Sequence, residues 1–400
     1  MAFLTHEPFY PPSGGGSSEA VYLVQEFVRR GHQVHVFGPR LDDPQAVAAR
    51  FGIQIHEFKA WRMGRYTALR NFKYLLYPFF LERLVQARAR SVPFDLVLSQ
   101  HAIAAVTAGR LKSSLALPVA MNFLDYLTGF LETWPRYLAP RPFITALKRY
   151  ELSLPSRHHA DAVLTVSDTL ADYFAQAGFP RARILPIYFG FDAELFLADP
   201  EAAPRPGSGP PTIVMHGSLD HHHLGRIALE ASALVAQARP EATLKFVGQH
   251  TPALNRFLAR LRARAPGLRV QCTGFVPYAE VARHLRDATV GIVPYEESTG
   301  VHCAFVAKVV EYLGVGLPVV STPLQAIRRY FAEEPRVRFA SFDGPSFARE
   351  ILRWLEEPWD RQRPLAQAAS QRVRRDLNWR VISRKAVDFV EQIRQPEGRP

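Results

Sequence analysis

Short apolar runs alternate with amphipathic stretches of helical length along nearly the whole chain. Apolar runs of about four or five residues predict buried strands, and apolar residues spaced three and four apart predict helices. Regular alternation of the two is typical of a doubly wound parallel sheet. The predicted strands are 2–5, 34–37, 96–99, 119–123 and 162–166 in the first half, and 212–215, 243–247, 269–273, 289–293 and 319–321 in the second.

One proline- and glycine-rich segment interrupts this alternation. Residues 199–211 read DPEAAPRPGSGPP, a composition that predicts a linker. We therefore predict two α/β domains, residues 1–196 and 212–378, joined by a linker at 197–211. The remaining residues, 379–400, contain an amphipathic helix at 383–394 whose apolar side could cover the first domain.

The first predicted strand leads into a glycine-rich turn. Residues 11–18 read PPSGGGSS, and Glu19–Arg30 follows as an amphipathic helix before the strand at 34–37. In such a βαβ unit the loop amides face a ligand at the carboxyl edge of the sheet. The glycines do not form GxGxxG, and the second strand does not end on an acidic residue, so that NAD binding is disfavoured.

In the second half, residues 304–322 (AFVAKVVEYLGVGLPVVST) predict a short helix feeding a buried strand. Phe305, Val309 and Leu313 supply the apolar side of the helix, which leaves Glu311 without a packing role; Lys308 lies on the same neighbouring stripe. These two lie three residues apart, so that both charged groups can point at one place, and the helix start could receive an anion. The alternative is a surface ion pair on an ordinary helix.

Composition and charge bound the possible partners. The chain of 400 residues is 48% hydrophobic and 22% charged, with a formal net charge of +12. Such a surplus can serve nucleic acid, anionic lipid or a phosphorylated substrate. Because the arginines are spread over many helices, without zinc spacing or an aromatic-interleaved basic block, nucleic acid is the least supported of the three.

The sequence favours a cytoplasmic protein. Its two cysteines, Cys272 and Cys303, suit a reducing compartment, and we find no signal-peptide pattern and no apolar run of membrane-spanning length. The basic, aromatic segment 61–90 predicts helices with an apolar side rimmed by cations. It suggests an acceptor contact or peripheral contact with an anionic membrane at its inner face. A core helix with a solvated arginine face is the simpler interpretation.

Several of these stretches together resemble the GT-B glycosyltransferases, specifically the large retaining family 4. They are residues 14–38, 161–196, 212–220 (TIVMHGSLD), 244–248 (LKFVG), 273–294 and 308–322 (KVVEYLGVGLPVVST). The resemblance implies two Rossmann-like domains facing a central cleft. It implies a hexosyltransferase that moves a sugar, with retention, from a nucleotide-sugar donor to a hydroxyl of a glycan, lipid-linked or small-molecule acceptor, as in cell-envelope or glycan biosynthesis. We expect no cofactor, and no obligatory metal because a DxD-like acidic pair is lacking.

The resemblance also implies a donor site. Glu311 matches the glutamate that holds the donor ribose hydroxyls, a role that suits a carboxylate because it accepts two hydroxyl hydrogen bonds. Phe275 and Val276 fall where the family's backbone brackets the base. Gly15 and Gly16 fall in the loop that approaches the donor phosphate and the acceptor. The other expected donor contacts are Gly217, Ser218, Phe305 and Val306.

This chain departs from the family pattern at several positions. Cys303 stands where a second glutamate usually touches the transferred sugar, and Ser218 stands where an arginine usually binds phosphate. The usual lysine falls within 221–224, where only histidines could replace it, and Asp125 lacks the histidine that often precedes it. Glu296 and Glu297 could replace the missing glutamate, although solvated loop acids are the simpler interpretation.

With these losses, the leaving diphosphate would be stabilised by Lys308, by the amides near residues 304–306 and by one protonated histidine of the triplet, for which we name His223. Asp125 is the remaining catalytic candidate. Two alternatives stay open at this point. One is a catalytically lapsed GT-B scaffold or glycan-binding subunit. The other is a nucleotide-sugar epimerase, which would ordinarily require more acid/base side chains in the cleft than we find in this sequence.

Overall fold

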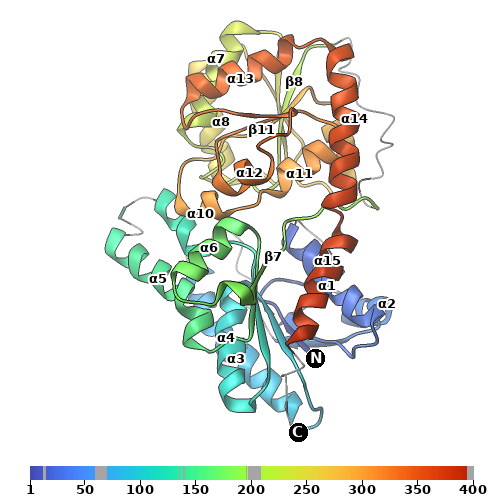
Figure 1. The fold of residues 1–400 in the computed structure, drawn as a ribbon. Helices are drawn as coiled ribbons and strands as arrows, with labels where there is room; N and C mark the ends of the chain where they lie inside the picture. Colours follow the sequence, from blue (N-terminus) through green and yellow to red (C-terminus); the bar gives the residue numbers. More distant parts are fainter. Residues whose placement is uncertain are drawn as a thin grey trace. The chain divides into compact units, whose positions relative to one another are not determined.

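The computed structural model describes residues 1–11, 15–58, 70–134, 136–137, 140–194, 196 and 209–393. It divides the chain into two compact units (Figure 1). Unit 1 takes Met1–Thr128, Pro140–Tyr188 and Trp379–Pro400, and unit 2 takes Gly129–Ala139 and Phe189–Asn378. The chain thus passes into unit 2 after Tyr188. Most of the predicted linker, 197–211, lies outside the described residues.

Unit 1 contains a parallel sheet of seven described strands in the order β3-β2-β1-β4-β5-β6-β7. The strands are β1 (Ala2–Leu4), β2 (His35–Pro39), β3 (Gln54–Phe58), β4 (Val97–Gln100), β5 (Val119–Phe123), β6 (Ala162–Thr165) and β7 (Ile184–Pro186). The order reverses between β1 and β4, which makes their carboxyl ends the place where ligands of such sheets usually bind. The sequence pattern missed β3, whose side chains are mostly half-exposed, and β7, which is only three residues long.

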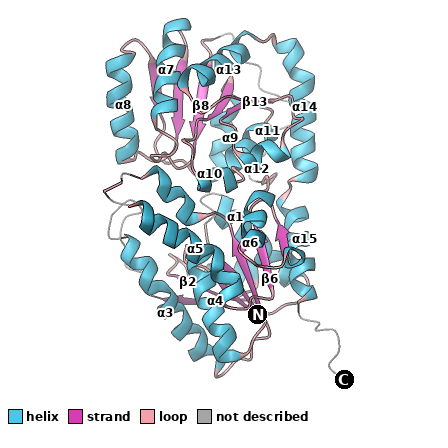
Figure 2. Ribbon diagram, turned by 60° about the vertical axis from the view of Figure 1, so that its left-hand side comes forward, coloured by secondary structure: helices cyan, strands magenta, loops and turns pink. Residues whose placement is uncertain are grey.

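Helices lie on both faces of this sheet (Figure 2). They are α1 (Gly15–Arg29), α2 (Pro44–Phe51), α3 (Arg70–Ala89), α4 (His101–Leu115), α5 (Arg141–Arg157), α6 (Asp168–Gln176) and α15 (Trp379–Gln392), with the short 3-10 turn η2 (Arg181–Arg183). A second 3-10 turn, η1 (Leu127–Thr133), starts in unit 1 and continues into unit 2 from Gly129. The prediction that α1 begins at Glu19 was wrong, because the helix already includes Gly15 and Gly16. First-turn amides need no intrahelical partner, so the glycines are tolerated there.

Unit 2 contains a parallel sheet of six described strands in the order β10-β9-β8-β11-β12-β13. The strands are β8 (Thr212–His216), β9 (Thr243–Val247), β10 (Arg269–Cys272), β11 (Val290–Val293), β12 (Val319–Ser321) and β13 (Val337–Phe339). The helices are α7 (Arg226–Ala238), α8 (Pro252–Arg264), α9 (Tyr278–Arg286), α10 (Thr299–Cys303), α11 (Ala307–Gly314), α12 (Gln325–Tyr330), α13 (Gly344–Glu356) and α14 (Trp359–Asp376). Apolar residues of α7, α8 and α13 pack with β8 and β9 in the core. Each unit is therefore the Rossmann-like layer structure that the alternation predicts.

The helix expected to contain Phe305 begins only at Ala307. Residues Ala304 and Val306 have extended backbones, with ψ of 127° and 111°. The Phe305 side chain is fully buried and packs edge-on to Tyr330 and nearly parallel to Phe331, at centroid distances of 5.2 and 5.8 Å. This aromatic packing fixes the chain just before the helix, so that α11 starts two residues later than the apolar spacing suggested.

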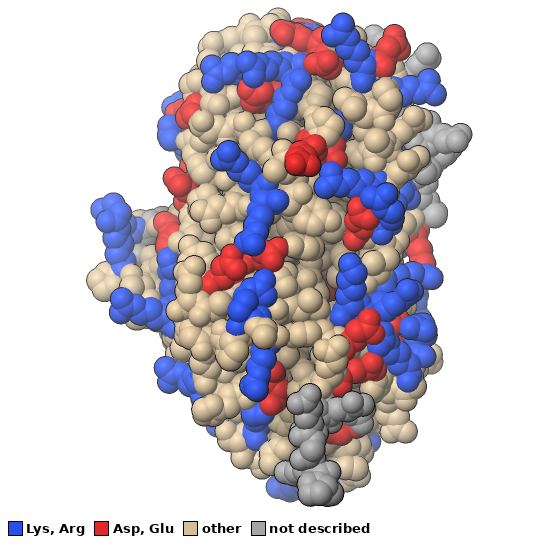
Figure 3. All heavy atoms as spheres, in the orientation of Figure 1, with Lys and Arg blue, Asp and Glu red and all other residues tan. Residues whose placement is uncertain are grey.

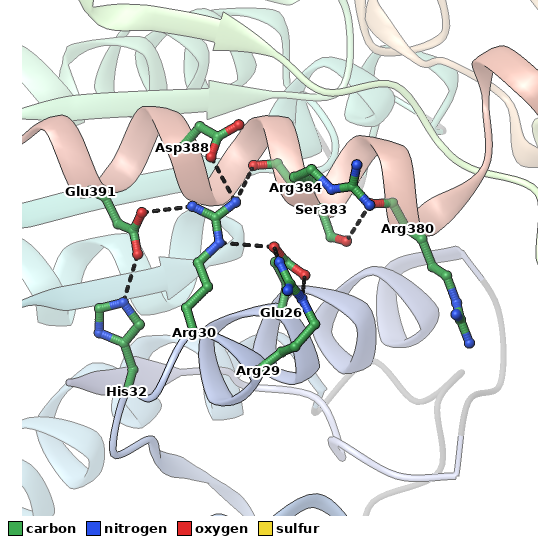
Figure 4. Close-up of polar contacts among 9 residues, drawn as sticks. All are labelled: Glu26, Arg29, Arg30, His32, Arg380, Ser383, Arg384, Asp388 and Glu391. Atoms are coloured by element: carbon green, nitrogen blue, oxygen red, sulfur yellow. Dashed lines mark hydrogen bonds and ion pairs between the residues drawn. The ribbon is translucent and has the colours of Figure 1, made fainter.

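The last described helix, α15, belongs to unit 1 and packs against α1, which confirms the expectation that it crosses back to the first domain. Arg30 makes ion pairs with Glu26 at 2.8 Å, Asp388 at 2.6 Å and Glu391 at 2.6 Å (Figure 4). His32 lies 2.7 Å from the other oxygen of Glu391. The Arg29 hydrogen bond is the largest influence on Glu26 and lowers its pKa to about 2. The pair Arg30–Glu26 is therefore ionised at neutral pH.

Candidate functional site

In unit 2, two glycines open the carboxyl end of the sheet. Gly217 follows β8 with φ of +95°, and Gly248 follows β9 with φ of +159°. A Cβ at Gly248 would lie 2.3 Å from the carbonyl oxygen of Gly217, and a Cβ at Gly217 would lie 3.2 Å from Cε of Lys308. Side chains are therefore excluded where Lys308 passes the end of β8.

Lys308 ends in a polar cluster. Its Nζ donates to the Tyr295 hydroxyl at 3.1 Å and lies 3.2 Å from Nε2 of His223. The same His223 nitrogen lies 2.7 Å from the Tyr295 hydroxyl. The cluster joins the first turn of α11, the residue two beyond β11 and the turn after β8, so that one cation is held at the point where these elements meet.

His223 is buried in this cluster. Burial is the main cause that holds its pKa well below 6.5, and His222, Lys308 and His216 add to the effect. The ring is therefore neutral at neutral pH in the unliganded protein. The protonated role that we expected for a histidine of the triplet would need a bound anion to offset this desolvation.

Glu311 is also buried, with 4% of its surface exposed. Its Oε2 pairs with Nε2 of His216, and its Oε1 accepts a hydrogen bond from the Tyr278 hydroxyl. The expectation that Glu311 has no packing role was wrong, because its carboxylate is buried and contacts two polar side chains, His216 and Tyr278. Lys308 lies next to Gly217 and Glu311 pairs with the preceding residue, His216, so that both charged groups come to the carboxyl end of β8.

The other expected donor residues lie around this point with different exposures. Phe275 is 71% exposed in the loop after β10, and Val276 beside it is half-buried. Ser218 is half-buried and directly follows Gly217. Val306 is the N-cap of α11 and is apolar, so that it offers no polar cap to the opening amides. Phe305 can contribute only its backbone, because its side chain packs in the core.

The acids proposed to replace the missing glutamate have other positions. Glu296 Oε1 accepts from the backbone amide of Ile227 at 2.8 Å, at the start of α7, whose N-cap is Gly225. Glu296 therefore caps a helix. Glu297 is largely exposed and lies 3.5 Å from His302. Cys303 is fully buried, as a small packed residue would be.

The remaining candidates, Gly15, Gly16 and Asp125, lie in unit 1. Asp125 follows β5 and is half-buried, and its charge adds to the burial that raises the pKa of Glu19 to about 8. Nδ2 of Asn122 donates to Oε1 of Glu19. Oε2 of Glu19 and Oδ1 of Asn122 are buried without a hydrogen-bond partner among the described residues. The structure thus gathers Lys308, Glu311 and His223 in unit 2, and the Asp125 group separately in unit 1.

Sequence reasoning missed His216, Tyr278 and Tyr295, which hold Glu311 and Lys308. His216 ends β8, Tyr295 follows β11 and Tyr278 begins α9, and their contacts with Glu311 and Lys308 depend on strand order. Among the described residues, we find no group of three or more His, Cys, Asp or Glu side chains placed so that they could bind a metal ion. Metal independence nevertheless stays a prediction.

Two family descriptions match consecutive parts of the chain. Residues 13–195 match "Glycosyltransferase Family 4", and residues 210–357 match "Glycosyl transferases group 1". Glycogen synthase from Mycobacterium tuberculosis is 23% identical over 245 residues, which are 60% of this chain and 56% of that protein. The match therefore spans little more than half the length of the relative.

Solved structures match over nearly the whole chain. Sucrose-phosphate synthase from Thermosynechococcus elongatus has a TM-score of 0.79 at 17% identity, with 98% of each chain covered. Anabaena HepE, in complex with UDP and glucose, has a TM-score of 0.71 at 17% identity, again with 98% of each chain covered. WaaG, a glycosyltransferase involved in lipopolysaccharide biosynthesis, has a TM-score of 0.65 at 17% identity and covers 97% of this chain and 99% of its own. These likenesses show that the fold is GT-B.

Proposed function

The chain belongs to the GT-B glycosyltransferases of family 4 (group 1), and from this premise we propose that it transfers a hexosyl group, with retention, from a nucleotide sugar to an acceptor hydroxyl. The observation that carries the proposal is the joint placement of Lys308 and Glu311 at the carboxyl end of β8. In a doubly wound sheet this edge is where ligands bind.

Glu311 is the proposed anchor of the donor ribose. One of its oxygens accepts from the Tyr278 hydroxyl in the unliganded protein. A ribose hydroxyl is the same kind of donor and can take its place with little loss of hydrogen bonding. The exposed ring of Phe275 and the adjoining Val276 would then lie beside the base. A related structure contains HepE in complex with UDP-glucose, which supports a nucleotide sugar as the donor class.

Lys308 is the proposed stabiliser of the leaving diphosphate. Charge grows on the diphosphate as the sugar departs, and a fixed cation contributes most in a site that excludes water. The opening amides of α11 add partial positive charge at the same place. Because Gly217 carries no side chain, a phosphate could approach Lys308 across it. Retention requires the acceptor hydroxyl to sit on the face that the diphosphate leaves, and Asp125 is the candidate we retain for the acceptor side.

The second candidate function is a lapsed scaffold or glycan-binding subunit. Ser218 and Cys303 favour it, since neither supplies the charge that the family usually has at those positions. The intact contacts of Lys308 and Glu311 favour transfer. Ligand binding separates the two.

We expect one nucleoside diphosphate, or its sugar, to raise the melting temperature. A ligand at a hundred times its dissociation constant stabilises the folded state by about 2.7 kcal/mol, equivalent to several degrees for a domain of this size. The measurement is a thermal melt with uridine, guanosine and adenosine diphosphates and their hexose conjugates. If none of these ligands shifts the melting temperature, the proposal of transfer fails and the lapsed scaffold is favoured.

We also expect binding to anionic vesicles through α3. Residues 59–69 lie outside the described part, but the helix exposes Leu75 (68%), Phe79 and Phe80 while burying Tyr77, Leu81 and Val85. The exposed side therefore carries more apolar area than the simpler interpretation allowed. On the face drawn in Figure 3, basic side chains are scattered among acidic ones, so that attraction to a membrane would be local. Within the described part of the chain, a bilayer-spanning helix would need a longer apolar stretch than any of the helices provides.

Co-sedimentation with phosphatidylglycerol and phosphatidylcholine vesicles measures this contact. We expect more binding to the anionic vesicles, less at high salt, and a loss in Leu75→Ser/Phe79→Ser. This role for α3 would be ruled out if the fraction of protein that co-sediments is the same at low and high salt and with both lipids. It would also be ruled out if the double variant co-sediments as much as the wild type.

A further inference from the structure

Residues 129–134 pack in unit 2, although the chain on both sides of residues 129–139 belongs to unit 1. The two residues before the segment are fixed within unit 1, because the amides of Leu127 and Thr128 donate to Glu151 at 3.0 and 2.8 Å. We call residues 129–134 the strap. It contacts unit 2 at two places, the α10 turn and His222.

The first contact is with the α10 turn. Glu132 accepts from the backbone amide of Thr299 at 2.7 Å and from the Thr299 hydroxyl at 2.8 and 2.9 Å. Ser298 already caps this helix by accepting from the amide of Val301. Glu132 therefore satisfies a second opening amide of a five-residue helix, which has few internal hydrogen bonds of its own.

Gly300 allows the strap to approach α10 closely. A Cβ on Gly300 would lie 2.5 Å from the backbone nitrogen of Phe130 and 2.7 Å from the carbonyl carbon of Gly129. No side chain fits at these distances, and the obstructing atoms are backbone. Because only residues 304–306 separate α10 from α11, holding α10 also holds the start of the helix that carries Lys308.

The second contact is with the histidines. The ring centroids of Phe130 and His222 lie 5.3 Å apart, and those of His222 and His223 lie 3.9 Å apart. His223 in turn contacts Nζ of Lys308 at 3.2 Å. The backbone carbonyl of His222 also accepts from the amide of Glu296 at 3.0 Å. A continuous series of contacts therefore runs from the strap to the Lys308 amine.

We propose that the strap is a positioning element of the donor site, in which Glu132 fixes the α10 turn and Phe130 fixes His222, so that the Lys308 amine is oriented through its own helix and through His223. Neither residue touches a reacting atom under this proposal. Its catalytic part rests on the proposed function, and its structural part does not. The competing explanation is that the strap is a clamp, by which we mean that its contacts only stabilise the fold of unit 2 and do not affect Lys308.

The first experiment needs no ligand. Burial, followed by the charges of Lys308 and His221, lowers the pKa of His222 to about 3, so that its ring should not titrate between pH 4.5 and 8 in nuclear magnetic resonance spectra. Nearby, His223 and Tyr295 also lie against the ring. Phe130→Ala uncovers part of the ring, so we expect its pKa to rise toward 6.5. Tyr137→Ala, at a residue that is 83% exposed and just beyond the strap, should leave the titration unchanged.

The second experiment uses the nucleotide sugar that the melting panel selects. We expect Glu132→Ala and Gly300→Ala each to lower kcat about tenfold or more, with nucleoside diphosphate affinity within about threefold, because Glu311 is untouched. Glu132→Asp should recover part of the rate through its retained carboxylate. Alanine is a better helix former than glycine, so that the loss in Gly300→Ala would come from displacing the strap.

The outcomes are distinct. A lower melting temperature with unchanged kcat and unchanged His222 titration would show a clamp and overturn the proposal. An unchanged His222 titration in Phe130→Ala would also overturn the proposal, whether or not the wild type binds a nucleotide. If the wild type binds no nucleotide, the proposed function fails, but a shifted His222 titration in Phe130→Ala would still support the positioning contact.

Discussion

Replacing Glu311 with alanine is expected to weaken nucleoside diphosphate binding by roughly tenfold or much more. A hydrogen bond from a hydroxyl to a carboxylate contributes about 1.5–3 kcal/mol, and Glu311 would accept two from the ribose. Calorimetric titration of wild type and variant with the selected nucleoside diphosphate measures the difference. Glu280→Gln, an equal charge change at an exposed position of α9, is the matched control.

The same substitution is also expected to lower the melting temperature of the unliganded protein. Its loss removes the acceptor of the Tyr278 hydroxyl and the partner of Nε2 in the buried His216 ring, and a buried polar group that loses its partner costs about 1–3 kcal/mol. Glu311→Gln keeps one acceptor oxygen and similar volume, so we expect it to melt closer to wild type while still binding weakly. Equal affinity of wild type and both variants would show that Glu311 is purely structural.

Replacing Lys308 with methionine is expected to lower turnover about 10²–10³-fold, the usual effect of removing one preorganised donor to a developing negative charge. Methionine keeps most of the stem that passes Gly217. Affinity for the nucleoside diphosphate should fall less than the rate, because the charge on the leaving group is greatest in the transition state. The measurement is kcat beside calorimetric affinity.

A matched control is Lys385→Met, at an exposed lysine of α15. We expect it to keep the wild-type rate. If Lys308→Met loses affinity and rate to the same extent, Lys308 binds the ground state as strongly as the transition state. If it loses neither, the diphosphate assignment is wrong and the α11 amides alone would have to support the reaction.

The architecture was accessible from the sequence because interior parallel strands are continuous apolar runs. This held for β8, β9 and β11, and it failed for β13, which is three residues long and half-buried at the sheet edge. The first residues of the helices were harder to predict from the sequence. The helix over Ala307–Gly314 begins late because of the aromatic cluster around Phe305, whose partners lie more than twenty residues away in the chain.

The site was accessible only in part. Lys308 and Glu311 could be paired from their spacing on one helix, since i and i+3 side chains are neighbours. His216 and Tyr278 could not be assigned to Glu311, because their approach depends on the parallel order of β8 and β11 and on the loop after β10. Glu296 shows the reverse error, since a loop acid that suggested chemistry serves as the cap of α7.

The return of α15 to α1 has a consequence for the order of folding during synthesis. Most of unit 1 is made before most of unit 2, yet unit 1 requires the α15 residues Trp379, Val387 and Val390, which are made after all of unit 2. At about 5–20 residues per second, translation from Phe189 to Asn378 takes on the order of 10–40 s. During that interval the α15-facing side of α1 stays uncovered while unit 2 forms. Unit 1 is therefore started before unit 2 but completed after it, and its nascent form exposes an apolar helix face that can aggregate.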